Sequence, residues 1–443
     1  MKANPNGARN GHFPVRAMLS GIGGSALEWY DFFLYGTASS LVFPKIFFTN
    51  ESTFIALILS YATFAIAFFS RPLGSALFAR IGDRIGRKAT LVVTTVTMGI
   101  GTTLIGLLPG YSSIGIWAPI LLIVLRFIQG IALGGEWGGG MLLVTENASR
   151  NQAGLYGSLP QMGLPIGLLL GGLLFEAVNP NSSTFLQWSW RLPFLITIIF
   201  TVIVLVLALG LDDPKEFEEV KRKGEISHSP LKDALKYHWP AVLKVVGTRI
   251  AENASYYILT TFLLTYATSN LHYSEGTVIN ATNIAAGIGI VTIPLFGYLS
   301  DKVGTRFIFI CASAALAVFA VPYYYLMGLS QGWMLFVVIV SVAVIWTAMY
   351  AVEGGLYTSL FPTRVRYSGV SFGYQAAGMI AGGPAPTLAA FLTHQYSNSF
   401  VPIAVYLIVI GLISMISAIA IERNPGANWD TSEGYKPGDV VDI

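Results

Sequence analysis

The hydrophobic pattern of the chain is a succession of long apolar runs separated by short polar turns. A run of about 20 residues is long enough for a helix to cross about 30 Å of hydrocarbon, so each run predicts a membrane-spanning helix. Twelve spans are expected. They are placed near residues 17–43, 54–80, 89–109, 116–145, 153–178, 192–211, 240–267, 278–299, 307–328, 332–359, 368–392 and 400–421.

A short charged sequence occurs twice, each time after the second span of a set of six. The first copy is Gly82-Asp83-Arg84-Ile85-Gly86-Arg87-Lys88, and the degraded second copy is Ser300-Asp301-Lys302-Val303-Gly304-Thr305-Arg306. Because the copies lie about half the chain apart, the sequence predicts two related six-helix bundles, an arrangement typical of transporters.

The expected domain organisation follows from this duplication. Residues 1–211 form the first bundle, 212–239 a cytoplasmic linker, 240–421 the second bundle, and 422–443 a cytoplasmic tail. Within the linker, Ser229-Pro230 followed by Leu231, Ala234, Leu235 and Trp239 predicts a capped amphipathic helix at the membrane surface. A solvated linker helix without a regulatory role is the simpler interpretation.

Composition supports an all-α membrane protein. Hydrophobic residues make up 54% of the 443 residues and charged residues 11%, whereas charged residues are roughly 25% of an ordinary soluble domain. The net charge of +3 is small and its basic residues lie in separate loops. The lipid bilayer is therefore the expected surrounding, and nucleic acid is not an expected partner.

Several classes of chemistry are disfavoured by what the sequence lacks. Its single cysteine, Cys311, lies inside an apolar span, and its histidines fall in tails, loops or span edges. No GxxxxGK[ST] sequence occurs, which argues against ATP as the driving force. Without a soluble domain or a nucleophile cluster, the chain is not expected to be an enzyme, and no cofactor or metal is expected.

The Lys and Arg residues predict the orientation of the chain. They concentrate in the N-terminal tail, the Arg84-to-Lys88 loop, the 212–239 connection and the C-terminal tail, which share one side, whereas only Lys45 and Arg191 lie on the other. The positive-inside rule then predicts cytoplasmic termini in a plasma (inner) membrane. A signal peptide is not expected, because the first span contains Glu28 and Asp31.

Polar residues recur on one face of the first, fourth, seventh and tenth spans. A charge at mid-bilayer costs roughly 3 kcal/mol or more unless it faces a partner or water, so these four faces are expected to line a central wet cavity. The members are Glu28, Asp31 and Tyr35; Arg126, Gln129, Glu136 and Trp137; Arg249, Glu252, Asn253 and Tyr256; and Trp346, Tyr350, Glu353 and Tyr357.

The chain resembles the major facilitator superfamily, and within it the metabolite:proton symporter family. The resemblance covers nearly the whole chain. It is carried by the 82–88 loop and by Glu28-Trp29-Tyr30-Asp31-Phe32, Arg71-Pro72-Leu73-Gly74, Arg126-Phe127-Ile128-Gln129-Gly130, Gly134-Gly135-Glu136-Trp137-Gly138-Gly139, Trp190-Arg191-Leu192-Pro193-Phe194 and Phe361-Pro362-Thr363-Arg364-Val365-Arg366-Tyr367-Ser368-Gly369.

This resemblance implies the major facilitator fold, with two six-helix bundles that rock about a central site and carry a small metabolite inward with protons. Similar transporters carry shikimate, 2-oxoglutarate, citrate, proline or betaine. The expected partners are accordingly a small molecule and protons, and the expected functional unit is a monomer. The sequence departs from the superfamily loop pattern at Ala79 and Thr305, where a glycine and an arginine are usual.

The two charged loops are expected to hold neighbouring helix ends together while the cavity is open on the far side. The candidate residues are Asp83, Arg84, Gly86 and Arg87 in the first copy, and Asp301, Lys302 and Arg306 in the second. A partly exposed ion pair contributes roughly 0–1 kcal/mol, so such a gate can open in every cycle. The alternative is that these charges only set the topology.

Arg126 and Arg249 are the expected substrate anchors, because a guanidinium offers a forked pair of donors to a carboxylate. The other candidate substrate contacts are Gln129, Trp137, Asn253, Tyr256, Tyr350 and Tyr374. Alternatively, Arg126 pairs permanently with Glu28 or Asp31, and Arg249 with Glu252, for helix assembly.

Asp31 leads the candidates for proton coupling, followed by Glu28 and Glu136, with Glu252 in the second half. Two arginines among carboxylates that a proton can neutralise favour an organic acid, such as a shikimate-like, oxo-acid or dicarboxylic metabolite. A zwitterionic osmolyte, proline or betaine, is the alternative, with Trp29, Tyr30, Trp137, Trp346 and Tyr350 as an aromatic box. A channel or uniporter is the alternative from another class.

Overall fold

The computed structural model describes residues 15–85, 87–134, 153–180, 182–209, 230–361 and 363–422. Nearly all of these residues are helical, and none of them belongs to a strand. In a bilayer the backbone must satisfy its own hydrogen bonds, and a helix does so within one segment. The described residues form twelve long helical stretches, several of them built from consecutive elements.

The first six stretches end at residue 209. They are α1 (Val15–Leu41), α3 (Thr53–Ile85), α4 (Arg87–Leu107), α6 (Trp117–Leu133), α8 (Ala153–Ser158) with η2 (Pro160–Met162) and α9 (Gly163–Ala177), and η3 (Ser189–Arg191) with α10 (Leu192–Leu209). Two short helices, α2 (Phe43–Ile46) and α5 (Tyr111–Ile114), lie in the connections.

The second six stretches follow α12 (Pro230–Tyr237). They are α13 (Trp239–Tyr257) with η4 (Ile258–Phe262) and α14 (Leu263–Ser269), α15 (Glu275–Val303), α16 (Thr305–Met327), α17 (Gln331–Val338) with η5 (Ile339–Trp346) and α18 (Thr347–Thr358), α19 (Thr363–Ala377) with η6 (Gly378–Gly382) and α20 (Ala385–Gln395), and α21 (Val401–Ile419).

These stretches overlap all twelve predicted spans, which confirms the all-α membrane fold. Within the described residues, eight helices are long and apolar enough to cross a membrane, and two shorter segments, 92–107 and 117–133, are also apolar. Large hydrophobic side chains such as Val318, Val291 and Trp117 are more than half exposed. An apolar surface of this kind is suited to contact with lipid.

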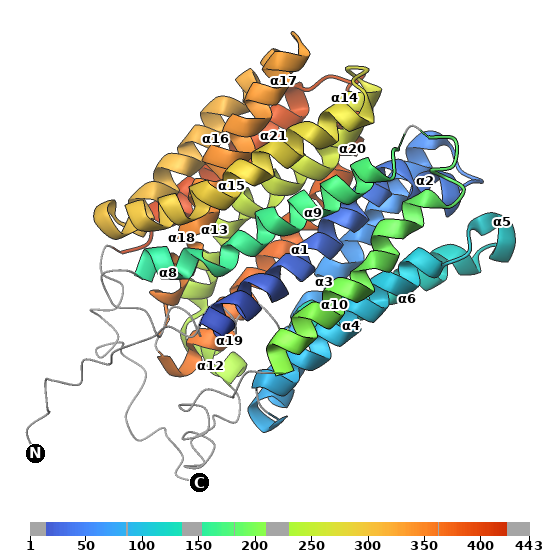
Figure 1. Cartoon of the computed structure of the whole chain (residues 1–443). Coiled ribbons are helices and arrows are strands. Elements are labelled where there is room, and N and C mark those ends of the chain that lie inside the picture. The colour runs from blue at the N-terminus through green and yellow to red at the C-terminus, as the bar shows by residue number, and fades with distance from the viewer. Residues whose placement is uncertain are drawn as a thin grey trace, which may run out of the picture.

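The helices run side by side along the molecule (Figure 1). In that view α8 and α12 lie at one end and α2 and α5 at the other, and these are called here the α12 end and the α2 end. Within the first six stretches α1 packs on α9, and α3 on α6. Contacts between the two sets join α15 to α8 and α9, α3 to α19 and η6, and α1 to η4.

The linker helix α12 is shorter than the sequence pattern suggested. It ends at Tyr237, and Trp239 already begins α13. Ala234 is completely buried, and α12 packs against α19. The small alanine side chain allows this close approach to the bundle. Residues 212–229 of the predicted linker and 423–443 of the predicted tail lie outside the described residues.

Candidate substrate and proton site

The polar face of α1 lies at the centre of the first site. Glu28, Asp31 and Tyr35 follow one another at helical spacing and are all buried. Trp29 is also buried, on the side that faces the second six helices. One helix therefore supplies both buried acidic side chains of the described first half.

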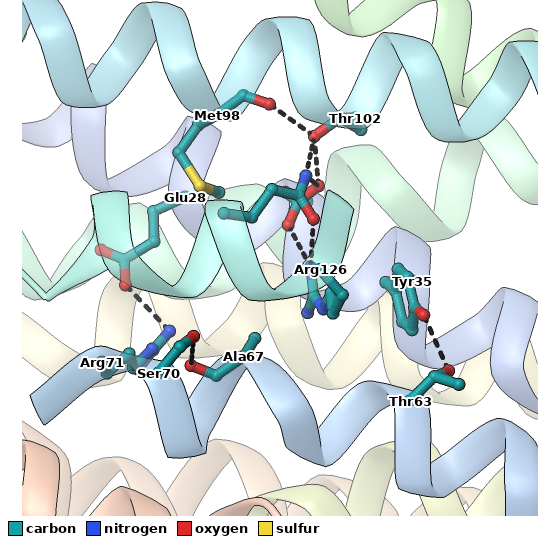
Figure 2. Close-up of polar contacts among 11 residues, drawn as sticks. Glu28, Tyr35, Thr63, Ala67, Ser70, Arg71, Met98, Thr102 and Arg126 are labelled. Atoms are coloured by element: carbon teal, nitrogen blue, oxygen red, sulfur yellow. Dashed lines mark hydrogen bonds and ion pairs between the residues drawn. The ribbon is translucent and has the colours of Figure 1, made fainter. Parts of the chain in front are cut away.

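Asp31 accepts hydrogen bonds from three side chains on two neighbouring helices, α6 and α4. Arg126 Nη1 on α6 donates to one carboxylate oxygen at 2.7 Å, and Gln129 Nε2 donates to the other at 3.1 Å. Thr102 on α4 also donates its hydroxyl to Asp31. Arg126 Nη1 also donates to Gln129 Oε1 at 3.1 Å. Figure 2 labels Arg126 and Thr102, and dashed lines mark the polar contacts of both side chains. The ionised pair is thus closely compensated although it is fully buried.

Glu28 has a separate partner. Arg71 Nη2 on α3 lies 3.3 Å from Glu28 Oε1 (Figure 2). The Arg71 guanidinium packs over the rings of Phe32 and Phe68, with its central carbon 4.3 Å and 4.8 Å from their centroids. Cation–π contacts of this kind favour a charged guanidinium at a dry position. Arg71 therefore belongs to the buried charge network, and Arg126 is not paired with Glu28.

The second half gathers two carboxylates around one cation. Arg249 Nη1 on α13 lies 2.8 Å from Glu353 Oε2 on α18 and 3.1 Å from Glu252 Oε2 on its own helix. Tyr357 donates a hydrogen bond of 2.7 Å to Glu353 Oε1. Tyr374 on α19 covers the guanidinium, whose central carbon is 3.0 Å from its ring centroid.

Both central arginines use the same part of the guanidinium for their internal partners. In Arg126 and Arg249 the hydrogen bonds to carboxylates come from Nη1. Nε and Nη2 of each are buried and have no hydrogen-bond partner among the described residues. The Nε–Nη2 edge carries two parallel donors and is an edge that can bind a carboxylate through both oxygens.

An aromatic layer lies between the two charge clusters. The ring of Trp29 is 6.3 Å from Tyr256 and 6.4 Å from Tyr350, both in the second half. Trp346 packs on these two tyrosines at 4.2 Å and 4.7 Å. The expected wet cavity is therefore closed in this structure, because large rings from both halves fill the space between the four polar faces.

A small pocket opens on the α2-end side of this aromatic layer. It lies between α1, α9, α15 and the η4–α14 segment. Its lining is a mixture of apolar side chains and threonine hydroxyls: Phe33, Thr37, Leu168, Gly172, Thr260, Thr261, Leu264, Val278, Ile279 and Thr282.

Most of the predicted substrate residues are buried near the two charge clusters, but their hydrogen bonding differs. Gln129 is fully engaged with Asp31, Arg126 and Thr102. Asn253 Oδ1 has no described hydrogen-bond partner and lies against Gly382, where a Cβ would be 1.8 Å away. Trp137 and Glu136 lie outside the described residues.

Four residues of the site had no substrate or proton role predicted from the sequence. Glu353 was expected to line the cavity, and both it and Arg71 are charges within spans, a signal that marks functional candidates. Thr102 and Gln161 had no such signal, because hydroxyl and amide side chains occur in many spans. Gln161 Nε2 donates to the Tyr350 backbone oxygen at 2.5 Å, and so links the two halves.

The second charged loop forms a contact between the halves. Asp301 accepts hydrogen bonds from the backbone N–H groups of Gly154 at 2.7 Å and Leu155 at 3.1 Å, in the first turn of α8. Arg306 donates to the backbone oxygens of Ala418 and Ile419 at the end of α21. The ammonium of Lys302 packs on Tyr298.

In the first copy of this loop, Asp83, Arg84 and Arg87 lie at the junction of α3 and α4. Their side chains, and Gly86 altogether, are outside the described part. Their gating role stays a prediction.

The fold and the buried charge clusters are those of a membrane transporter, and comparison with known proteins identifies its family. Residues 22–386 match the model of the Major Facilitator Superfamily, and the chain belongs to this superfamily. It is therefore a transporter and not an enzyme.

Two curated relatives bear substrate names. The "Shikimate transporter" of Escherichia coli K12 is 37% identical over 417 residues, covering 93% of this chain and 95% of the relative. The "Proline/betaine transporter" of Salmonella typhimurium LT2 is 34% identical over 422 residues, covering 92% and 83%. These names agree with the predicted resemblance to metabolite:proton symporters.

Solved structures support the same fold at low sequence identity. The proton:xylose symporter XylE bound to 6-bromo-6-deoxy-D-glucose superposes with a TM-score of 0.70 at 17% identity, over 91% of this chain and 94% of that chain. The inward-open conformation of XylE from E. coli gives 0.65 at 18% identity, over the same shares.

Proposed function

We propose that the protein imports a small organic acid, shikimate-like or an oxo or dicarboxylic acid, together with protons. The observation that carries this proposal is that the Nε–Nη2 edges of Arg126 and Arg249 have no partner in the described part of the chain. Buried donors without a partner are costly, so a substrate carboxylate that fills such an edge gains both charge pairing and hydrogen bonds. A relative with the printed name "Shikimate transporter" supports the same class.

In this mechanism the substrate competes with the internal carboxylates. When the cavity opens, the substrate binds a guanidinium edge, and a proton on the neighbouring carboxyl frees the arginine from its internal partner. Asp31 is the proposed acceptor beside Arg126, with Glu28, Glu136 and Glu252 as the other candidates. Movement of the two halves about this centre then exposes it to the opposite side, the alternating access expected of such a fold.

The proposed setting is the plasma (inner) membrane, with the α12 end and both termini on the cytoplasmic side. The excess of Lys and Arg in connections on that side supports this orientation. One chain carries both halves of the site, so the protein is proposed to work as a monomer. The proton gradient is the proposed energy source, and no cofactor is proposed.

A zwitterionic osmolyte is the second candidate substrate. The cluster of Trp29, Tyr256, Trp346 and Tyr350 provides aromatic faces from both halves. If these rings separated as the cavity opened, they would suit a quaternary ammonium group. A relative named "Proline/betaine transporter" supports this alternative.

Competition in proteoliposomes tests the proposal. Radiolabelled shikimate and glycine betaine are offered in turn, with an inward proton gradient and with a protonophore. Accumulation of shikimate against its gradient, abolished by the protonophore and blocked by other organic acids, is expected. Uptake of betaine alone would favour the osmolyte, and equilibration without accumulation would indicate a channel or uniporter.

A further inference from the structure

The buried charges of the two halves are balanced differently. In the described part of the first half, each buried carboxylate has its own guanidinium: Glu28 is beside Arg71, and Asp31 is beside Arg126. In the second half Glu252 and Glu353 both face Arg249, at 3.1 Å and 2.8 Å. If every group is ionised, this second cluster has one negative charge in excess.

Among the described residues, no second cation pairs with the two carboxyls. The charged and titratable groups that act on them are Arg249, Tyr256, Tyr257, Tyr350, Tyr357 and Tyr374. Only Arg249 in this set is positive. Arg71, which also acts on Tyr257, is already paired with Glu28. Glu252 and Glu353 are 1% and 0% exposed, so water does not screen the excess charge either.

We propose that Glu252 and Glu353 form a proton-binding site that holds one proton between them while the central cavity is closed. Two carboxyls that share one guanidinium behave as a coupled pair, and the pair is electrically neutral with Arg249 only when one carboxyl is protonated. An unpaired buried charge is otherwise avoided by neutralisation. The ligand of this site is a proton, and the two carboxyl groups that bind it come from α13 and α18.

The position of the site connects this proton to the rest of the centre. The Trp346 Nε1–H donates to the Glu252 backbone oxygen at 2.9 Å, and Trp346 is part of the aromatic layer between the halves. Opening of the layer therefore exposes the acid pair. A role for this proton in coupling rests on the proposed function, whereas its presence in the closed protein does not.

Infrared spectroscopy of the purified protein at neutral pH tests the proposal without any substrate. The C=O stretch of a protonated carboxyl is distinct from the carboxylate bands and shifts in deuterium oxide. Wild type is expected to show this band, and Glu252→Gln and Glu353→Gln are each expected to remove it, because either change leaves one carboxylate for Arg249. Glu28→Gln, the same substitution in the one-to-one pair with Arg71, is the matched control and retains the band.

The shared proton is excluded if wild type lacks the band, or if the band survives in both Glu252→Gln and Glu353→Gln. If the band survived in only one of the two variants, the carboxyl that remains in that variant would hold the proton by itself, because it is buried. That outcome would also exclude sharing. The wild-type spectrum keeps the test decisive if a variant does not fold. Accumulation assays in proteoliposomes judge proton symport separately, so a wild type that shows the band but does not accumulate substrate refutes only the coupling role.

Discussion

At the scale of single residues, the two halves treat a buried arginine in the same way. In both Arg126 and Arg249, Nη1 donates a hydrogen bond to a carboxylate of the protein. An aromatic ring packs on the face of each guanidinium: the central carbon lies 4.1 Å from the ring centroid of Tyr35 in the first half and 3.0 Å from that of Tyr374 in the second. A ring covers the face of a guanidinium but does not satisfy the donors on its edge. Each arginine is thus held in place while its forked edge stays without a described partner.

Arg126→Lys is expected to impair uptake severely while the protein remains folded and inserted. Lysine keeps the positive charge near Asp31 but lacks the two parallel donors of the fork. Hydrogen bonds to charged groups contribute about 1.5–3 kcal/mol, so KM for the organic acid is expected to rise about tenfold or more. The measurement is initial uptake rate against substrate concentration in proteoliposomes.

Arg191→Lys provides a matched control for that experiment. Arg191 Nη1 donates to the backbone oxygens of Gly106 and Leu108, away from the central charges. The same substitution there is expected to leave KM unchanged. Near-normal KM in Arg126→Lys would rule out the fork as a substrate anchor.

Asp31→Asn is expected to separate substrate exchange from accumulation. Asparagine resembles the protonated carboxyl, so Arg126 is released from its ion pair in every state and the proton no longer changes anything at this position. Exchange of labelled for unlabelled substrate persists, whereas accumulation on an imposed pH gradient is lost. Glu51→Gln, at an exposed loop position, is the control. Concentrative uptake by Asp31→Asn would move the coupling role to another carboxyl.

At the scale of helices, glycines set the close approach of α3 and α6. A Cβ on Gly74 would lie 2.0 Å from the backbone oxygen of Ile131, and one on Gly130 would lie 2.3 Å from that of Ala67. These neighbours are main-chain atoms and cannot rotate away. Because α3 presents Arg71 and α6 presents Arg126, the packing of this pair also sets where two of the buried cations lie.

Gly74→Ala is expected to destabilise the protein by about 1–3 kcal/mol or more, the usual cost of overpacking a close contact. The readout is Tm of the purified protein in detergent. Gly287→Ala on α15 is the matched control, since no atom lies within 4 Å of its added Cβ. There the alanine is expected to leave Tm unchanged or to raise it, because alanine favours helix. Equal Tm values for the two variants would contradict this account.

The positions of the helices could be predicted from the sequence, because the thickness of the bilayer imposes a length on every apolar run. The pairing of the buried charges could not be predicted from the sequence. Glu28 and Asp31 share one face of α1, and only the rotation and register of α3 and α6 decide that Arg71 meets the first and Arg126 the second.

The π-helical turns are a second feature that the sequence did not reveal. The segments η4, η5 and η6 each contain a turn wound with one additional residue, and no residue type marks such a turn. Two of them border the aromatic layer: η4 begins two residues after Tyr256, and η5 ends at Trp346. The hydrophobic periodicity of the sequence predicts that these aromatic residues lie on helices, but it does not predict the direction in which their side chains point.

At the scale of the whole molecule, the two halves are in contact at both ends. At the α2 end the Tyr61 hydroxyl hydrogen-bonds with Ser40 of the first half and Thr265 of the second, each at 2.7 Å. At the α12 end Asp301 binds the first turn of α8. With the aromatic layer between them, these contacts describe a state closed on both sides.

Tyr61→Phe and Asp301→Asn are expected to shift this closed state in opposite directions. Tyr61→Phe removes the hydrogen bond to Thr265 in the other half, which contributes about 1 kcal/mol, so opening at the α2 end is favoured about fivefold. Asp301→Asn removes the negative charge from the helix N-terminus and favours opening at the α12 end. Distances between spin labels report each opening, with the exposed native Cys311 first replaced by alanine.

One label pair spans the α2 end, on cysteines placed at the exposed positions Glu51 and Gln395, and the other spans the α12 end, at Leu209 and Phe307. Each substitution is expected to lengthen only the distance at its own end, because the two contacts close opposite sides of one central site. Tyr325→Phe, at a tyrosine that is 61% exposed, is the control for loss of a hydroxyl and is expected to change neither distance. If Tyr61→Phe and Asp301→Asn lengthened the same pair, or neither, these contacts would not be the gates.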